Sequence, residues 1–219
     1  MEHGHRHRNP APGEGQKEFF NKLAGEWDTI TIHDENKVRY ITSLLSLDGN
    51  ERILDVGAGT GVMVPFYKEH ITTGSVLAID FSENMISQCR KKFPPSEHPN
   101  VAFEVADVYD LKFEKEFDVV MCYSCFPHFT DHQRAIDIFA RSLRQGGKFA
   151  IAHSSSRDHI NHIHGGSSHH IQKDVLPSLK ELNSMFVKAG LSVTFERSDD
   201  DYHIIVGEKK RRLTSIFGK

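Results

Sequence analysis

The feature that most constrains this chain of 219 residues is a glycine-rich segment directly after an apolar run. Residues 53–56 read Ile-Leu-Asp-Val, and residues 57–61 read Gly-Ala-Gly-Thr-Gly. An apolar run that enters glycines and is followed by an amphipathic segment predicts a strand that turns sharply into a helix. Because glycine has no Cβ, such a turn lets the backbone approach a ligand closely. The segment therefore predicts an α/β domain with a ligand-binding turn.

A second acid closes the next apolar run. Residues 76–79 lead into Asp80, about 25 residues after Asp55. Parallel strands present their carboxyl ends at one edge of a sheet, so Asp80 is expected where the ribose hydroxyls of a nucleoside would lie. A pyrophosphate cofactor favours the spacing Gly-x-Gly-x-x-Gly, but this chain has Val62 at the place of that third glycine and has its own third glycine at position 61. The pattern therefore favours a nucleoside without a pyrophosphate.

Apolar spacing along the rest of the chain predicts an alternation of helices and strands. Helical spacing covers residues 17–27, 37–45, 61–69, 82–93, 131–143 and 178–189. Apolar runs predict strands at residues 53–56, 76–80, 101–105, 117–122, 148–152, 191–197 and 202–208. Alternation implies parallel strands with helices on both faces, whereas the short turn before the last strand requires an antiparallel pair. The predicted fold class is α/β: a Rossmann-like, doubly wound, seven-stranded sheet, mostly parallel, with an antiparallel C-terminal hairpin.

Length and composition predict one domain with short tails. Residues 1–16 are expected to form a flexible His-rich tail, residues 17–210 the domain, and residues 211–219 a basic C-terminal tail. A net charge of −3 gives no electrostatic case for a nucleic-acid partner, so a small-molecule partner is expected. Neither a membrane-spanning run nor the apolar core of a signal peptide is present in the sequence, and the three cysteines are too few for a disulfide framework. These features predict a cytoplasmic protein, and none of them indicates an oligomeric state.

Several of these motifs together resemble the class I S-adenosylmethionine-dependent methyltransferases, in particular the small-molecule, UbiE-like group, also called methyltransferase type 11. The resemblance covers roughly residues 19–208 and rests on the glycine turn, Asp80 and the segment Ala106-Asp107-Val108, which fall in the family's order. It implies S-adenosylmethionine as the cofactor. The activity it implies is transfer of the methyl group to an N, O, S or C atom of a small molecule by in-line displacement.

The resemblance also implies which residues hold the cofactor. In the family, the glycine turn surrounds the methionyl part, Asp80 binds the ribose hydroxyls, Phe81 lies beside the adenine, and Asp107 takes the adenine amino group. The alternative for Asp80 and Asp107 is that they are helix-capping or loop acids. The implied cofactor-binding residues are Asp55, Gly57, Ala58, Gly59, Thr60, Gly61, Asp80, Phe81, Met85, Asp107, Val108, Cys122 and Tyr123.

Candidate acceptor-side residues follow the fourth and fifth predicted strands. His128 is a candidate base, because a histidine titrates in the right range, or it packs at the end of its strand. His153 and a short helix that carries Arg157 and His164 are expected to close over the acceptor, within a His-rich insertion at residues 154–177. Arg157 is a candidate clamp for an anionic acceptor. The candidate catalytic residues are therefore His128, His153, Arg157 and His164.

The histidines also raise the question of a divalent metal. His128, His153, His159, His162 and His164 are candidate ligands, because imidazole binds several transition metals. The alternative is a solvated loop with incidental histidines, which the neighbouring Gly-Gly-Ser-Ser sequence favours for His169 and His170.

The pair Cys122-x-x-Cys125 has several interpretations. It is a redox pair, half of a zinc site, or a buried strand cysteine beside a cysteine of the pocket wall. A further alternative is that Cys125 binds a soft metalloid acceptor, as in the arsenite methyltransferases. Phe20 and Trp27 belong either to an N-terminal lid or to the core of an amphipathic helix.

Two other functions remain open for the chain as a whole. One is an NAD(P)-dependent oxidoreductase on the same sheet. The other is a non-catalytic sensor module that binds S-adenosylmethionine or a metal.

Overall fold

The architecture is that of a computed structural model, which describes residues 14–165 and 174–210. Its helices are α1 (Glu14–Leu23), α2 (Trp27–Ile30), α3 (Glu35–Ser43), α4 (Val64–Lys68), α5 (Glu83–Lys92), α6 (His132–Ser142), α7 (Arg157–Gly165) and α8 (Leu179–Lys188), with short 3-10 turns η1 (Val108–Asp110) and η2 (Phe126–His128). Its strands are β1 (Arg52–Val56), β2 (Ser75–Asp80), β3 (Val101–Val105), β4 (Phe117–Tyr123), β5 (Leu143–His153), β6 (Leu191–Ser198) and β7 (His203–Lys209).

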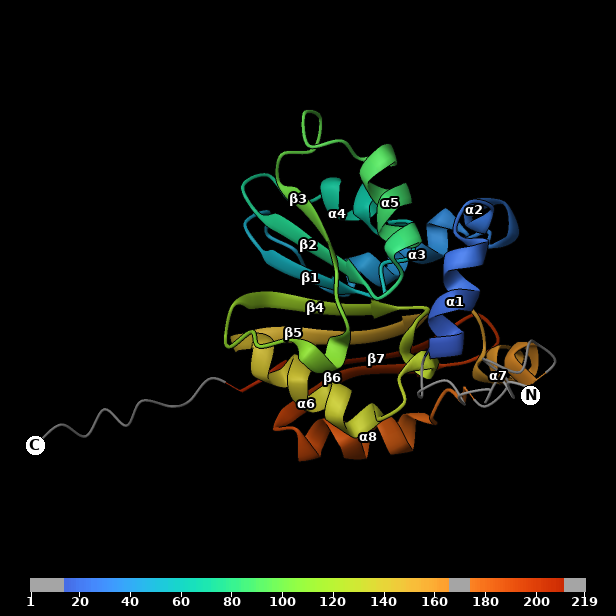
Figure 1. Ribbon diagram of the computed structural model, residues 1–219. Coiled ribbons are helices and arrows are strands. Elements are labelled where there is room, and N and C mark those ends of the chain that lie inside the picture. Colours follow the sequence, from blue (N-terminus) through green and yellow to red (C-terminus); the bar gives the residue numbers. More distant parts are fainter. Residues whose placement is uncertain (1–13, 166–173, 211–219) are drawn as a thin grey trace, which may run out of the picture.

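The strands form one seven-stranded sheet in the order β3-β2-β1-β4-β5-β7-β6 (Figure 1). The strands β1 to β5 pair in parallel, and β7 runs antiparallel to both β5 and β6. The predicted fold class is confirmed, including the antiparallel hairpin at the C-terminal end. The strand order places β1 and β4 at the centre, with the crossover direction changing between them, which is where open α/β sheets bind ligands.

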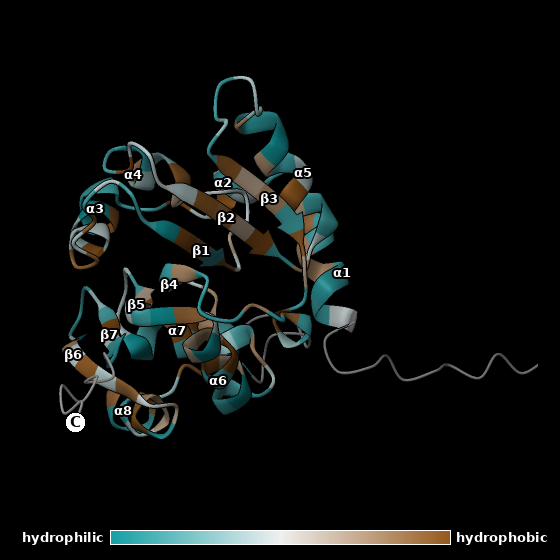
Figure 2. Ribbon diagram, turned by 90° about the vertical axis from the view of Figure 1, so that its left-hand side faces the viewer, coloured by the Kyte–Doolittle hydropathy of each residue, from teal (hydrophilic) through white to brown (hydrophobic). Residues whose placement is uncertain are grey.

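Helices cover both faces of the sheet because successive strand residues point to opposite sides. On β1, Ile53 belongs to the core under α3, α4 and α5, whereas Leu54 belongs to the core under α6 and α8. On β4, Met121 and Val120 divide in the same way. Figure 2 shows the hydrophobic residues of β2 and β3 next to α5, much of which is hydrophilic. The continuous apolar runs in the sequence are therefore strands buried on two sides.

The ends of the parallel strands lie under the N-terminal helices. In Figure 1, α1, α2 and α7 gather at the right-hand end of the sheet, where β1, β2 and β4 finish. Phe20 of α1 and Ala24, which directly follows α1, form a small core with Met85 of α5, and Phe19, Trp27 and Phe81 pack against it. Segments that are far apart in the sequence thus meet at this edge. None of the helices among the described residues is long and apolar enough to cross a membrane.

Several predicted boundaries were wrong. The first helix begins at Glu14, so residues 14–16 belong to the folded part, and it breaks before Trp27 because Leu23 is followed by a turn through Gly25. The helix predicted from Gly61 begins at Val64, since Gly61 has a φ of +88° that a helix does not accept. The strand predicted over residues 148–152 extends over residues 143–153. Residues 1–13, 166–173 and 211–219 lie outside the described residues, and they include most of both predicted tails and, in the His-rich insertion, His169 and His170.

The face under α6 and α8 generates a stability prediction. Phe149 of β5 is fully buried, and its ring lies 4.9 Å from that of Phe186 and 5.2 Å from that of Phe139. Phe149→Ala should lower the free energy of unfolding by about 3–5 kcal/mol, because a large cavity replaces the ring. Urea unfolding measures this change. The exposed Val187 of α8 provides the control, since Val187→Ala should change the free energy by less than about 0.5 kcal/mol.

Candidate functional site

The glycine turn lies at the end of β1 and has a backbone that only glycine adopts easily. Gly57, Gly59 and Gly61 have φ angles of +65°, +55° and +88°. A Cβ on Gly57 would also lie 2.6 Å from the Cβ of Cys125, in the turn after β4. The turns after β1 and β4 are thus packed directly against each other, and a side chain at position 57 would separate them.

Asp80 fixes this turn from the end of β2. Its Oδ2 accepts a hydrogen bond from the backbone N–H of Gly59 at 2.9 Å, and its Oδ1 accepts one from Ser82 at 2.9 Å. Only 7% of the residue is exposed. Burial raises the pKa of Asp80 above its ordinary value, although the two backbone bonds oppose this shift. The carboxylate therefore lacks a full set of partners, and a ligand that donates hydrogen bonds would compensate for its burial.

Asp55 lies inside the fold rather than in the pocket. Its Oδ1 accepts a hydrogen bond from the Tyr67 hydroxyl at 3.3 Å, and its Oδ2 is buried without a recorded partner among the described residues. Burial raises the pKa of Asp55 to about 7, against the Tyr67 bond and with help from the nearby Asp80. Asp55 is therefore a buried, easily protonated acid behind the turn.

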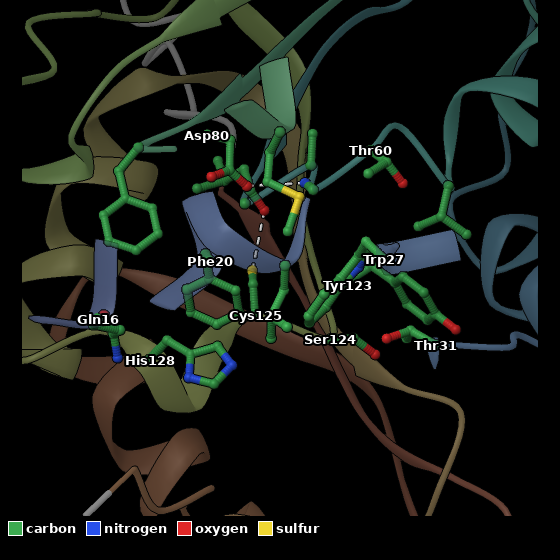
Figure 3. A pocket seen from close by; sticks show the side chains of 18 of the residues that line it. Gln16, Phe20, Trp27, Thr31, Thr60, Asp80, Tyr123, Ser124, Cys125 and His128 are labelled. Atoms are coloured by element: carbon green, nitrogen blue, oxygen red, sulfur yellow. Dashed lines mark hydrogen bonds between the residues drawn. The ribbon is translucent and has the colours of Figure 1, made fainter. Parts of the chain in front are cut away.

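A cavity of about 830 Å³ opens in front of the turn (Figure 3). Its volume falls in the range of small-molecule binding sites. In the view of Figure 3, Asp80 and Thr60 lie above Phe20 and Cys125, with His128 and Gln16 on the left and Trp27 and Thr31 on the right. One cavity therefore connects the ends of β1, β2 and β4 with the N-terminal helices.

The N-terminal helices supply an aromatic and charged wall. The ring of Phe20 makes edge contacts with the rings of Trp27, Phe81 and His128, at centroid distances of 5.6, 5.9 and 5.1 Å. The prediction that Phe20 and Trp27 belong to an N-terminal cover agrees with this position, because both residues line the cavity.

Asp28 attaches this wall to the glycine turn. It accepts hydrogen bonds from the Thr60 hydroxyl and, at 2.8 Å, from Lys92 Nζ. Although partial burial raises the pKa of Asp28, these two bonds bring it below the ordinary value. Asp28 is therefore ionised at neutral pH and joins α2 to both the turn and α5.

His128 is held by a carboxylate. Its Nδ1 lies 2.6 Å from Asp174 Oδ2, and the same oxygen accepts a hydrogen bond from Gln16 Nε2 at 2.8 Å. A carboxylate accepts hydrogen bonds, so Nδ1 of His128 donates to it, and in the neutral form of the ring Nε2 carries the lone pair. In the view of Figure 3, one ring nitrogen lies on the Gln16 side and the other faces the middle of the cavity. This arrangement orients a base.

Two further histidines complete a cluster with His128, which we call the histidine cluster (His128, His153 and His164). The rings of His128 and His164 lie 5.0 Å apart, and His164 Nδ1 donates to the backbone oxygen of Asp174 at 2.9 Å. His153 is 2% exposed, and its Nε2 has no partner among the described residues. Burial holds the pKa of His153 well below its ordinary value, with smaller effects from His203 and His128. Burial and His128 also lower the pKa of His164.

Tyr123 anchors the opposite side. Its hydroxyl lies 2.9 Å from His33 Nδ1 and 2.8 Å from Ser154 Oγ. Burial raises the pKa of Tyr123, against the bond to Ser154, so the phenol is neutral at physiological pH. It joins β4, the loop before α3 and the end of β5.

Most of the residues predicted from the sequence line this cavity. They are Gly57, Ala58, Gly59, Thr60, Asp80, Phe81, Met85, Asp107, Val108, Tyr123, His128, His153, His159 and His164. Asp107 is exposed and caps η1 through the backbone N–H of Tyr109. Cys125 also lines the cavity, whereas Cys122 is fully buried in the strand, which agrees with the structural alternative for the pair.

In addition to Asp55, four other predicted site residues do not line the cavity. Cys122 faces the core on the α6 side, and a Cβ on Gly61 would lie 2.8 Å from the Phe93 ring rather than face the cavity. Arg157 Nε donates to the backbone oxygen of Leu176 at 2.8 Å, so its guanidinium is bound to the loop after α7. His162 is exposed and does not line the cavity.

The prediction of a metal site receives no support. Among the described residues, no group of three or more His, Cys, Asp or Glu side chains is arranged to hold a metal ion. His128 and His164 instead use their Nδ1 atoms for Asp174.

Sequence reasoning missed Gln16, Asp28, His33 and Asp174. None of them follows a strand, and none belongs to a spacing motif. The only available signal was that acids and amides near a predicted histidine base are candidate partners, which does not select Asp174 from the chain's many acids.

Comparison with known proteins identifies the domain. A family model described as a methyltransferase domain matches residues 53–147, which contain the glycine turn, Asp80 and His128. The match favours the methyl-transfer prediction over the alternative of a dinucleotide-dependent oxidoreductase.

Curated relatives carry the same signal over part of their length. The chain is 27% identical over 135 residues to a malonyl-[acyl-carrier protein] O-methyltransferase of Acetivibrio thermocellus, which covers 61% of this chain and 47% of the relative. It is 31% identical over 139 residues to a ubiquinone biosynthesis O-methyltransferase of Coxiella burnetii, which covers 59% of this chain and 57% of the relative. The chain spans about half the length of the curated relatives it matches.

A solved structure shows the same fold. The magnesium protoporphyrin IX methyltransferase of Synechocystis PCC 6803, solved with bound S-adenosylmethionine, has a TM-score of 0.71 at 14% identity, with 92% of this chain and 99% of that chain covered. At this identity the similarity concerns the fold alone.

The buried acid behind the turn generates a pH prediction. The folded chain holds a proton on Asp55 up to about pH 7, whereas an ordinary Asp loses its proton near 3.8. The folded state therefore binds more protons between these values, so stability falls as pH rises through this window. Between pH 5 and 7 this amounts to roughly 2–3 kcal/mol.

Asp55→Asn should remove most of that slope, because its amide has no proton to lose and keeps an oxygen for Tyr67. Urea unfolding at pH 5, 6, 7 and 8 measures it, with Asp200→Asn at an exposed position as control. Equal slopes for the wild type and Asp55→Asn would contradict the assignment of a raised pKa to Asp55.

Proposed function

Because the chain belongs to the class I S-adenosylmethionine-dependent methyltransferases, we propose that it transfers the methyl group of S-adenosylmethionine to a small-molecule acceptor. The observation that supports this function is the continuity of one cavity. It extends from Asp80 and the glycine turn to His128, the candidate base, whose Nδ1 is held by Asp174. A donor site and an acceptor site are thus provided by the same enclosure.

The donor-side residues fit a cationic nucleoside without phosphates. The cavity lining contains the carboxylates of Asp28, Asp80 and Asp107, and its one lysine or arginine among the described residues, Lys92, is bound to Asp28. Such a lining attracts positive charge and repels phosphate. Asp80, buried with only backbone partners, suits the two hydroxyls of a ribose, since hydrogen bonds to a carboxylate are stronger than neutral ones.

S-adenosylmethionine, when bound, supplies a methyl group on a positively charged sulfur. We assign its binding to Asp80, Asp107 and the backbone of the glycine turn, with Phe81 and Met85 as apolar neighbours. Asp55 supports the turn from behind. Gly61 and Cys122, which were predicted to bind the cofactor, have structural roles in this proposal: Gly61 allows the backbone of the turn, and Cys122 packs in the core from β4.

The chain's main contributions to the reaction are alignment, exclusion of water and removal of a proton. Phe20 and Trp27 cover the cavity with apolar surface, which keeps water from competing with the acceptor. Asp174 holds His128 in the tautomer whose Nε2 accepts a proton, and Gln16 stabilises the same carboxylate oxygen. His128 then removes the acceptor proton as the acceptor is methylated.

Asp80→Asn should weaken binding of S-adenosylhomocysteine by at least about tenfold, because a neutral amide oxygen accepts hydrogen bonds more weakly than a carboxylate. Titration calorimetry measures the dissociation constant, and the melting temperature shows whether the turn stays folded. Asp110→Asn, at an exposed acid outside the cavity, is the matched control and should bind like the wild type. Unchanged affinity in a folded Asp80→Asn variant would contradict the donor assignment.

His128→Gln should reduce methyl transfer by about 100-fold or more and leave the affinity for S-adenosylhomocysteine within about twofold, since proton removal alone is affected. Transfer is measured with isotopically labelled S-adenosylmethionine and small molecules of a cell extract, by mass spectrometry. Asp174→Asn should also reduce transfer, because the imidazole loses the carboxylate that orients it.

His70→Gln, at an exposed histidine after α4, serves as the control. Normal transfer by His128→Gln would remove His128 from the reaction, whereas absence of labelled product with the wild type would count against methyl transfer itself.

A further inference from the structure

The side of the cavity that faces the histidine cluster presents imidazole nitrogens, which accept hydrogen bonds when the rings are neutral. His128 and His164 both donate through Nδ1 to Asp174, so in the neutral form of each ring the Nε2 atom can only accept. His153 adds a third Nε2, which is buried and lacks a partner among the described residues. A group that brings its own hydrogen-bond donor would satisfy the Nε2 atoms of His128 and His164, and a group with lone pairs alone would not.

The described lining of the cavity also offers no free positive charge from lysine or arginine to an anionic acceptor. Arg157, the residue expected to clamp an anion, donates to the backbone of Leu176 and does not line the cavity. Lys92 is held by Asp28 at 2.8 Å. A carboxylate or phosphate would therefore enter a cavity lined by three acids with no lysine or arginine available to pair with it among the described residues.

Apolar side chains line the outer part of the same cavity. Ile30 and Ile32, in and after α2, are 54% and 88% exposed and still line the cavity. Ile160 and Ile163 line it from α7. Large aliphatic side chains that remain exposed beside a cavity mark a place where apolar ligand surface is buried. The cavity thus has acceptor nitrogens inside and apolar surface outside.

We infer that the methyl acceptor is an uncharged molecule with an apolar body and one hydroxyl group, the hydroxyl bound to the histidine cluster and the body lying against Ile30, Ile32, Ile160 and Ile163. This inference rests on the proposed function. It excludes carboxylates and phosphorylated amines as acceptors. It also predicts O-methylation.

The transfer is balanced without a further reactant. The acceptor oxygen forms the new C–O bond while the S–CH₃ bond breaks, and the electron pair of that bond stays on sulfur and cancels its positive charge. His128 Nε2 takes the hydroxyl proton and returns it to solvent. The products are a methyl ether and S-adenosylhomocysteine.

Matched small probes test the inference on the full chain. Titration calorimetry measures the binding of 4-hexylphenol, 4-hexylbenzoate and 4-hexylphenyl phosphate to protein saturated with S-adenosylhomocysteine. The hydroxyl probe should bind at least about tenfold more tightly than either anion, because burial of an unpaired charge is unfavourable. Equal or tighter binding of an anionic probe, or no binding by any probe at millimolar concentration, would overturn the inference.

A variant tests the apolar part. Ile32→Ser should weaken 4-hexylphenol binding by about fivefold or more and leave unsubstituted phenol unchanged, since only the hexyl chain reaches this residue. Val187→Ser, at an exposed position on α8, is the control and should bind both probes like the wild type. Equal affinity of wild type and Ile32→Ser for 4-hexylphenol would refute the placement of the apolar body.

The failure of this inference and that of the proposed function are distinguishable. If S-adenosylhomocysteine binds but the anionic probes are preferred, the acceptor class is wrong and the donor site stands. If S-adenosylhomocysteine itself does not bind, the proposed function fails, and the acceptor inference fails with it. With labelled S-adenosylmethionine and wild-type protein, label should appear in the neutral, organic-soluble fraction of a cell extract, and label confined to the acidic fraction would overturn the inference.

Discussion

The hydrogen bond from the backbone N–H of Gly59 to Asp80 holds together the region on which the site depends. This bond joins the turn after β1 to the end of the neighbouring strand β2. Gly57, Gly59 and Gly61 of the turn have left-handed backbones and no side chains that could make such a bond. Cys125 packs against Gly57 from the third side, so three neighbouring strand ends form one rigid floor. A buried carboxylate that holds backbone and still has lone pairs to offer is both a structural bond and a ligand site.

The sheet could be predicted from the sequence because strands buried on both faces produce apolar runs, and because parallel crossovers have one hand. Helix starts were predictable where a capping side chain precedes them, as Ser82 does before α5 and Asp131 before α6. The start of α1 was not predictable. Residues 14–16 have no apolar periodicity, and Gln16 is held instead by a tertiary bond to Asp174.

In the candidate site, too, some residues could be predicted from the sequence and others could not. Asp80, His128 and His153 were found because they lie at, or a few residues after, the ends of strands that finish at one edge of the sheet. Asp174 and His33 reach the site from loops whose paths no local pattern specifies. Arg157 was misassigned for the same reason, since its position after β5 was predictable but its bond to the carbonyl of Leu176 was not.

One oxygen of Asp174 serves two donors, the side chains of Gln16 and His128, which come from the first helix and from the turn after β4. All three side chains lie mostly out of water. A substitution that removes the polar group of any one of them leaves a donor or an acceptor in the interior without its partner. The three positions are therefore coupled, and we expect a substitution at one of them to be tolerated only when the other two change with it.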